Sequence, residues 1–260
     1  MRSKTDSTYL DLRERILFGE LEPGSPFSAA DMADHYDLHI NMARRLLVAM
    51  KVGGYLTRSG PSYVISTFTH AQVEEWRLAL AAIVEIGALR LALSPSQRLQ
   101  PLANFVDKRI RDVPVDHEDF FLGAMGLTNI VLGGNNSTLS ELVTQFIPQA
   151  FFRLLWLSDT YADRTGFLVE ASDRFLAAAK GGDLDGVRQA SRFFFDGIAP
   201  ALRTLIEKRE EGIYPARDRK DGFQTIEYNI AGYPTHAGSS RTFTPVILPL
   251  AEIDLVALEL

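Results

Sequence analysis

One segment near the N-terminus carries cationic side chains that could bind a polyanion. Arg44 and Arg45 are adjacent, and Lys51 follows them. No acidic residue occurs between Asp37 and Glu74. Guanidinium and ammonium groups bind phosphates and also donate to the guanine edge in the major groove of DNA. The whole chain has a net charge of −6, but the field that a ligand meets depends on where the charges lie. Nucleic acid is therefore a candidate ligand for this segment.

The composition excludes several other kinds of site. The 260 residues contain no cysteine, which excludes disulfides, thiolate nucleophiles and thiolate metal ligands. The five histidines are scattered, and no nucleophile motif or phosphate-binding glycine loop occurs, so we expect no catalytic residues and no cofactor. No apolar run approaches the ~20 residues of a membrane span, and the N-terminus lacks the apolar core of a signal peptide. We expect a cytoplasmic protein that does not bind a membrane.

The cationic residues lie in a segment with helical periodicity. Ser28 is a favourable N-cap for a helix over residues 29–36, and residues 37–39 form a turn. The next helix has apolar residues at i, i+3, i+4 and i+7, which we expect to be buried: Ala43, Leu46, Leu47 and Met50. A second set with the same spacing must face away from that core: Asn41, Arg44, Arg45 and Val48. Two helices joined by a short turn predict a helix-turn-helix.

Two short strands are predicted directly after the second helix. Gly53 and Gly54 end that helix, and the run YLTRSGPSYVI places β-branched and aromatic residues on both sides of residues 59–61. This hairpin would be the wing of a winged helix-turn-helix, in which the second helix enters the major groove of DNA. The opposing interpretation is a helical hairpin whose exposed arginines are only solvated.

The segment YLDLRERILFGELEPGSPFSAADMADHYDLHINMARRLLVAMKVGGYL resembles the winged-helix domain of the GntR family of bacterial transcription regulators. It aligns without a gap to the family's Pro-Gly turn, its Leu-Ala helix and its Val-Arg-Glu-Ala-Leu recognition helix, and the match covers residues 9–66. The resemblance implies a domain over residues 1–68 that binds a double-stranded DNA operator. On this basis the predicted DNA-binding residues are Ser28, His39, Asn41, Arg44, Arg45, Lys51 and Arg58.

The sequence departs from this family at positions that the family uses on DNA. Arg44 keeps the arginine of the Val-Arg pair, but Ala30 and Ile40 stand where arginine is usual. Arg45 stands at the usual glutamate, and Pro61 replaces a glycine of the wing. Loss of a bidentate guanine contact would remove ~1–3 kcal/mol of discrimination. We therefore expect an altered operator or weaker binding.

Helical periodicity dominates from residue 69 onward. The run HAQVEEWRLALAAIVEIGALRLAL predicts one long helix, and further helices are separated by GGNN and GGD. No period-2 runs occur, so we predict an antiparallel all-helical bundle over residues 69–212 and a mainly α fold for the chain. The order of domains and the run AAAKGGDLDGVRQASRFFFDGI, with Asp183 at the usual aspartate, resemble the FCD (FadR-like) branch of GntR regulators. The resemblance implies that the bundle binds an effector and forms the dimer contact.

Most members of that branch hold a divalent metal in the bundle with one aspartate and three histidines. Here the expected histidine positions contain Phe121 (or Gly126, because of an insertion), Ser172 and Phe194. The acids and histidine at residues 116–119 are consecutive, so they splay around a helix and cannot all face one ion. We expect no metal site.

Aromatic residues are abundant in this bundle. In one interpretation they fill the core and collapse the pocket. In the other they line an apolar cavity, where a few polar groups orient an apolar or aromatic effector. The second interpretation gives a predicted ligand-binding set: Phe121, Asn136, Arg153, Trp156, Ser172 and Phe194.

Residues 213–260 extend beyond the usual end of this branch. Their last part, PVILPLAEIDLVALEL, is apolar, and if exposed it would form an apolar surface prone to association. We expect this extension to dock on its own bundle or on a partner subunit, as a helix or as a strand.

These observations lead to one main functional hypothesis. We expect a ligand-responsive bacterial transcription regulator that binds a palindromic operator as a homodimer, and not an enzyme. The alternative is a protein–protein interaction module whose DNA-binding domain has decayed.

Overall fold

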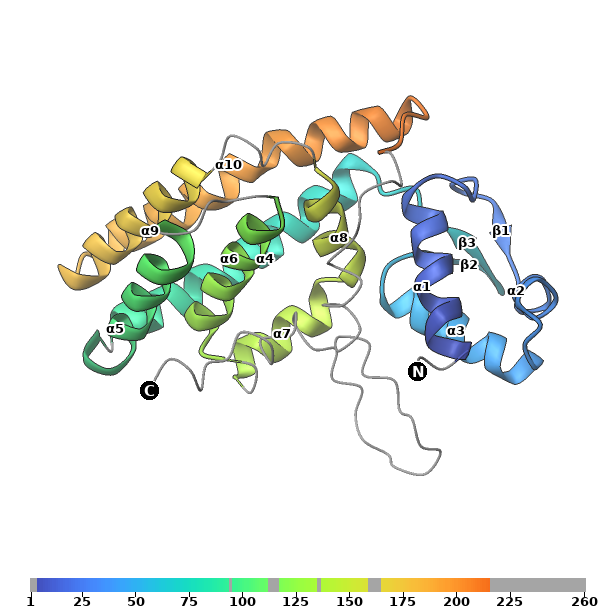
Figure 1. The fold of residues 1–260 in the computed structure, drawn as a ribbon, viewed down its shortest axis with the longest axis horizontal. Coiled ribbons are helices and arrows are strands. Elements are labelled where there is room, and N and C mark those ends of the chain that lie inside the picture. Colours follow the sequence, from blue (N-terminus) through green and yellow to red (C-terminus); the bar gives the residue numbers. More distant parts are fainter. Residues whose placement is uncertain (1–3, 94, 112–116, 135–136, 159–164, 216–260) are drawn as a thin grey trace. The chain divides into compact units, whose positions relative to one another are not determined.

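The computed structural model describes residues 4–93, 95–111, 117–134, 137–158 and 165–215 (Figure 1). Its contacts divide the chain into two compact units. Within the described residues, the first unit takes 4–73, 148–158 and 202–215. The second unit takes the described residues of 74–147 and 159–201. The first unit is therefore discontinuous in the sequence. The predicted domain boundaries at residues 68 and 212 stay a prediction.

The first unit begins with three helices: α1 (Lys4–Leu17), α2 (Ala29–Tyr36) and α3 (Ile40–Val52). Ser28 caps α2, because its hydroxyl accepts from the Asp31 amide while the Asp31 carboxylate accepts from the Ser28 amide. Asp37 then takes a left-handed backbone conformation with φ of 48° and ends α2. His39 caps α3. The predicted helix-turn-helix is confirmed.

The apolar face of α3 is buried, as its spacing predicts. Its buried residues are Ala43, Leu46, Leu47 and Met50. Helix α3 contacts α1 and α2, whose Leu12, Ile16 and Met32 are also fully buried. Burial of one such large apolar side chain contributes ~1.5–3 kcal/mol. This core fixes the rotation of α3 and leaves its opposite face at the surface.

A three-stranded antiparallel sheet completes the winged helix: β1 (Pro26–Phe27), β2 (Leu56–Ser59) and β3 (Ser62–Ile65). The strand order is β1-β3-β2, with Thr57 opposite Val64 in the hairpin and Phe27 opposite Tyr63 at the other edge. Gly60 turns the hairpin with a positive φ of 59°. The wing is confirmed, and β1 is an additional strand that the sequence did not predict.

Two later segments belong to the first unit: α8 (Gln149–Leu157) and the last turns of α10 (Leu184–Glu210). The Ala150 amide donates to the Gly53 carbonyl at 2.9 Å, which joins the start of α8 to the end of α3. The buried Arg209 donates to the carbonyl of Leu17 at the end of α1. Burial lowers the pKa of Arg209 to about 10. An arginine at this place pairs with carbonyls that the helix leaves unpaired.

The second unit is helical throughout its described residues. Its helices are α4 (His70–Ala92) from residue 74 onward, α5 (Pro95–Val106), the π-helical turn η1 (Asp107–Arg111), α6 (His117–Leu132), α7 (Thr138–Phe146), α9 (Thr165–Lys180) and α10 up to residue 201. Helices α5, α6 and α9 contact one another. Asp183 precedes α10, where its carboxylate accepts from the Gly186 amide at 2.9 Å. The predicted helical bundle and the mainly α fold are confirmed.

The predicted docking of residues 213–260 falls almost wholly on residues 216–260, which lie outside the described residues. Within the described ranges, no helix combines the length and the apolar character that a membrane crossing requires.

Candidate nucleic-acid interface

The exposed face of α3 carries most of the predicted DNA-binding residues. Its exposed side chains are Asn41, Arg44, Arg45, Val48, Lys51 and Val52. The set that was predicted from spacing to face away from the core does so. Helix α3 contains no acid. Its surface therefore offers cations, one amide and two valines to a ligand.

The N-terminal end of α3 is ordered by two local contacts. The backbone amide of Asn41 donates to Nδ1 of His39 at 3.2 Å, and this contact caps the helix. One guanidinium nitrogen of Arg44 donates to Oδ1 of Asn41 at 3.3 Å. Arg44 is thus held beside the end of the helix that contacts bases in helix-turn-helix proteins.

Arg45 and Lys51 form no ion pair among the residues that the structure describes. Arg58 is exposed on β2, where its Nε donates to the Gly60 carbonyl at 3.1 Å. A cation therefore lies on the wing as well as on α3. Ser28 is also exposed, but its hydroxyl is engaged in the cap of α2.

The acid in the turn before α3 is neutralised within the first unit. Nζ of Lys4 lies 2.9 Å from Oδ2 of Asp37. The hydrogen bond and the charge of Lys4 lower the pKa of Asp37. Both side chains are exposed, so the pair contributes little stability. Its electrostatic consequence is that the carboxylate next to the cationic face has its own counter-ion.

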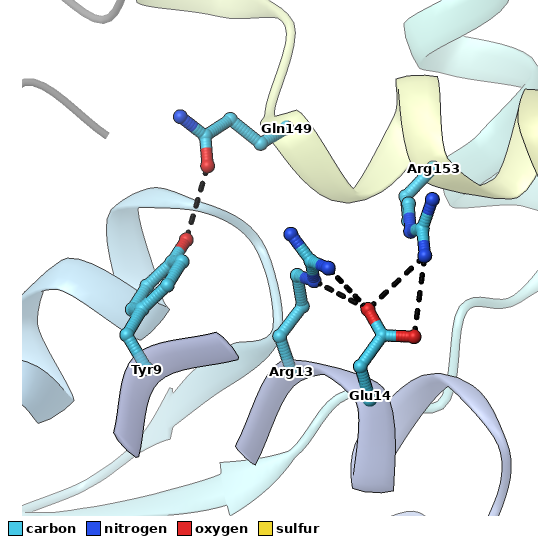
Figure 2. Close-up of polar contacts among 5 residues, drawn as sticks. All are labelled: Tyr9, Arg13, Glu14, Gln149 and Arg153. Carbon is cyan, nitrogen blue, oxygen red and sulfur yellow. Dashed lines mark hydrogen bonds and ion pairs between the residues drawn. The ribbon is translucent and has the colours of Figure 1, made fainter. Parts of the chain in front are cut away.

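A buried ionic cluster joins α1 to α8 inside the first unit, and Figure 2 shows its members. Nε of Arg13 lies 2.7 Å from Oε1 of Glu14, and a nitrogen of Arg153 lies 3.1 and 3.2 Å from the two carboxylate oxygens. The Tyr9 hydroxyl donates to Oε1 of Gln149 at 3.0 Å nearby. Burial alone would raise the pKa of Glu14, but the two guanidinium groups outweigh it and lower the pKa below its ordinary value.

The predicted ligand-binding residues do not all lie in one place. Ser172 and Phe194 line a cavity in the second unit. Arg153 and Trp156 are buried on α8 in the first unit, where Arg153 contacts Glu14. Asn136 and the side chain of Phe121 lie outside the described residues. The structure therefore brings two of the six predicted residues together.

The cavity has a volume of about 70 Å³ and lies among α4, α5, α6, α9 and α10. Its walls are mostly aliphatic, with Phe175 and Phe194 as the aromatic members. The hydroxyl of Ser172 donates to the Leu168 carbonyl, and that of Thr128 donates to the carbonyl of Ala124. Two of the three hydroxyls in the wall are therefore used within their own helices, the third being that of Ser191, so the cavity suits a mostly apolar group. Among the described residues, no cluster of three His, Cys, Asp or Glu side chains could hold a metal ion.

Sequence reasoning missed Glu14, Arg13 and most of the cavity wall. Glu14 and Arg153 are 139 residues apart, and no local spacing connects them. The wall residues, such as Val84, Leu102 and Val131, are aliphatic, so they carry the same signal as any core residue.

Comparison with known proteins gives matches of fold. No protein-family model matches the chain, and no curated protein matches it at a significant level. The structure of Lar, described as controlling expression of the Listeria monocytogenes agr system, has a TM-score of 0.59 and 15% identity, covering 79% of this chain and 99% of that chain.

Two further structures have TM-scores below 0.5. McbR/YncC of E. coli has a TM-score of 0.48 and 18% identity, covering 81% of this chain and 100% of that chain. A GntR family transcriptional regulator from Pseudomonas syringae pv. tomato str. DC3000 has a TM-score of 0.45 and 13% identity, covering 80% and 88%. The likeness to Lar thus extends over about four-fifths of this chain and is one of fold.

Proposed function

We propose that this protein is a transcription regulator that binds a palindromic DNA operator as a homodimer and responds to a small ligand, rather than an enzyme. The observation that carries the proposal is the acid-free, exposed face of α3, where Arg44, Arg45 and Lys51 project from a winged helix. A helix with this placement in the fold enters the major groove, and its cations replace the counterions of the phosphates.

An apolar stripe on α4 supports the homodimer. Leu78, Ala82 and Ile86 are exposed at spacings of four residues, so they share one side of the helix, and the exposed Leu93 follows directly after its last residue. The exposed fractions of Leu78, Ile86 and Leu93 are 53%, 55% and 68%. A row of large apolar side chains on one helix is typical of a surface that a partner covers. A second copy of the chain would bring two winged helices to the two half-sites of a palindrome.

The cavity in the second unit supports a ligand response. Its aliphatic walls, with Ser172 and Phe194 among them, match an apolar or aromatic effector in polarity, but its volume of about 70 Å³ requires the walls to move apart before a molecule of that size enters. Such a ligand would regulate DNA binding only if it binds more tightly to one arrangement of the winged helices than to the other.

A mobility shift against the DNA upstream of the protein's own gene tests the function. We expect retardation at low salt, and we expect Arg44→Ala to weaken binding by ~1–3 kcal/mol if Arg44 contacts a base. Arg203→Ala is the matched control, because Arg203 is an exposed arginine on α10. Absence of retardation by a folded dimer would count against DNA binding.

The second candidate is a protein–protein interaction module. It is favoured by the departures from the resembled family at Ala30, Ile40 and Pro61, of which Ala30 and Pro61 are exposed. The same mobility shift separates the two functions, because an interaction module would not retard DNA.

A further inference from the structure

Val48 is an apolar side chain at the centre of a cationic surface. It is 53% exposed and does not belong to the buried face of α3. Successive residues of a helix are rotated by about 100°. On this basis Val48 and Asn41 lie in the middle of the exposed arc. Arg44 and Lys51 lie on one side of it, and Arg45 lies on the other.

A helix in the major groove meets different chemical groups at its centre and at its sides. Residues along the centre face the base edges, whereas residues at the sides lie nearer the phosphates of the groove walls, where a long cationic side chain can reach a phosphate or a base edge. A valine cannot donate to a phosphate or to a base edge. The major-groove feature that complements it is the C5-methyl group of thymine.

We propose that Val48 is a specificity-determining residue that packs against a thymine methyl group in each half-site. The proposal rests on the DNA-binding function proposed above. It adds a base preference at a position that the predicted set of DNA-binding residues did not include.

The charges around Val48 favour DNA over a second copy of the chain. A two-fold contact through this face would place the patch that holds Arg44 and Arg45 against the same cationic patch of the partner. Like charges brought together in this way oppose association. A polyanion instead gains from the same cations. The apolar stripe on α4 contains no cation between Leu78 and Ile86, so it offers a second copy a better surface than α3 does.

The spacing of Asn41 and Val48 along α3 predicts how many base pairs separate the two bases that they contact. Seven residues of α-helix advance by about 10.5 Å, which corresponds to about three base pairs at 3.4 Å per step. The side chain of asparagine pairs with adenine in the major groove. We therefore expect an adenine and the thymine read by Val48 to lie about three base pairs apart in each half-site.

The experiment separates the thymine methyl from every other feature of the base. Double-stranded DNA of random sequence is enriched on the full-length protein at low salt. The thymines of the enriched sequence are then replaced one at a time by deoxyuridine, which lacks only the C5-methyl group. At one position per half-site we expect binding to weaken roughly fourfold, the effect of one buried methyl group.

The variants assign that effect to a residue. We expect Val48→Ala to bind the thymine and deoxyuridine duplexes equally. Val52→Ala is the matched control, because Val52 is 44% exposed at the last residue of α3, and it should keep the wild-type preference. Circular dichroism checks that both variants are folded.

Each other outcome has a defined meaning. If the wild type binds every deoxyuridine duplex as tightly as the parent, the proposal is overturned, although the enrichment itself upholds DNA binding. If folded protein enriches no sequence, the DNA-binding function fails and the proposal fails with it. If Val48→Ala changes the sedimented mass but not the methyl preference, a second copy covers Val48 and the proposal is overturned.

Discussion

Glu14 lies between two guanidinium groups that are themselves fully buried. Ion pairs in such an environment must offset the cost of removing charges from water, so they specify a geometry more than they add stability. In this protein the geometry is the attachment of α8 to α1, which crosses 139 residues of sequence. The cluster therefore fixes how α8 packs against α1 within the first unit.

Replacement of the carboxylate tests this cluster. Glu14→Gln leaves two buried cations without the charge between them, and we expect a loss of ~3–5 kcal/mol in the free energy of unfolding. Urea titration followed by circular dichroism measures the loss. Glu20→Gln is the control, because Glu20 pairs with Arg15 at 3.6 Å on the surface, and it should cost less than ~1 kcal/mol. Equal losses in the two variants would mean that the buried cluster has no special role.

The pH dependence of stability follows from the same carboxylate. The pKa of Glu14 is lowered in the folded chain from its ordinary value of 4.5. A group with a lowered folded pKa contributes its full stability above the unfolded pKa and loses it as the pH falls through the folded pKa. We expect the urea midpoint of the wild type to fall below pH 4.5 more steeply than that of Glu14→Gln. Parallel curves for the two proteins would contradict this assignment.

Sequence reasoning succeeds where the signal is local and fails where it is not. The spacing of Leu46, Leu47 and Met50 predicted the buried face of α3, because a helix repeats every 3.6 residues. Strand β1 has two residues, which is too short for a period of two to appear. Arg153 was expected at a ligand, but its neighbour Glu14 comes from a helix that no spacing rule could connect with α8.

At the level of elements, the junction of α3 and α8 depends on a glycine. Gly54 has a φ of 82°, and a Cβ atom there would lie 2.7 Å from the Cβ of Pro148. Gly60 in the wing has a φ of 59°, but a Cβ atom there would have no neighbour within 4 Å. The two positions share the backbone strain and differ in the contact with Pro148.

This pair of glycines gives a matched measurement. Gly60→Ala should cost ~1–2 kcal/mol, the cost of a left-handed conformation for an L-residue. Gly54→Ala should cost at least ~1 kcal/mol more, because overpacking adds to the strain. Thermal or urea unfolding of the two variants gives the difference. If Gly54→Ala is no worse than Gly60→Ala, the contact between α8 and the end of α3 is loose.

At the level of the whole molecule, the proposed dimer surface and the proposed DNA-binding surface are different. The apolar stripe lies on α4, and the cationic face lies on α3. We expect Ile86→Lys to convert a dimer into a monomer, because it places a charge in the middle of the stripe, and sedimentation equilibrium measures the mass. Glu75→Lys, at an exposed position near the start of α4, is the control and should remain dimeric. If the wild type is a monomer, the stripe is not a dimer surface.

The salt dependence of DNA binding tests the central claim most directly. Arg44, Arg45, Lys51 and Arg58 from two subunits offer roughly eight phosphate-reaching cations, so the plot of log binding constant against log salt should have a slope of about −7. If Arg45 contacts a phosphate, Arg45→Ala should make this slope shallower by about 2, because each dimer loses two cations. A slope near zero, or one that Arg45→Ala leaves unchanged together with the affinity, would contradict the claim that the exposed face of α3 binds DNA.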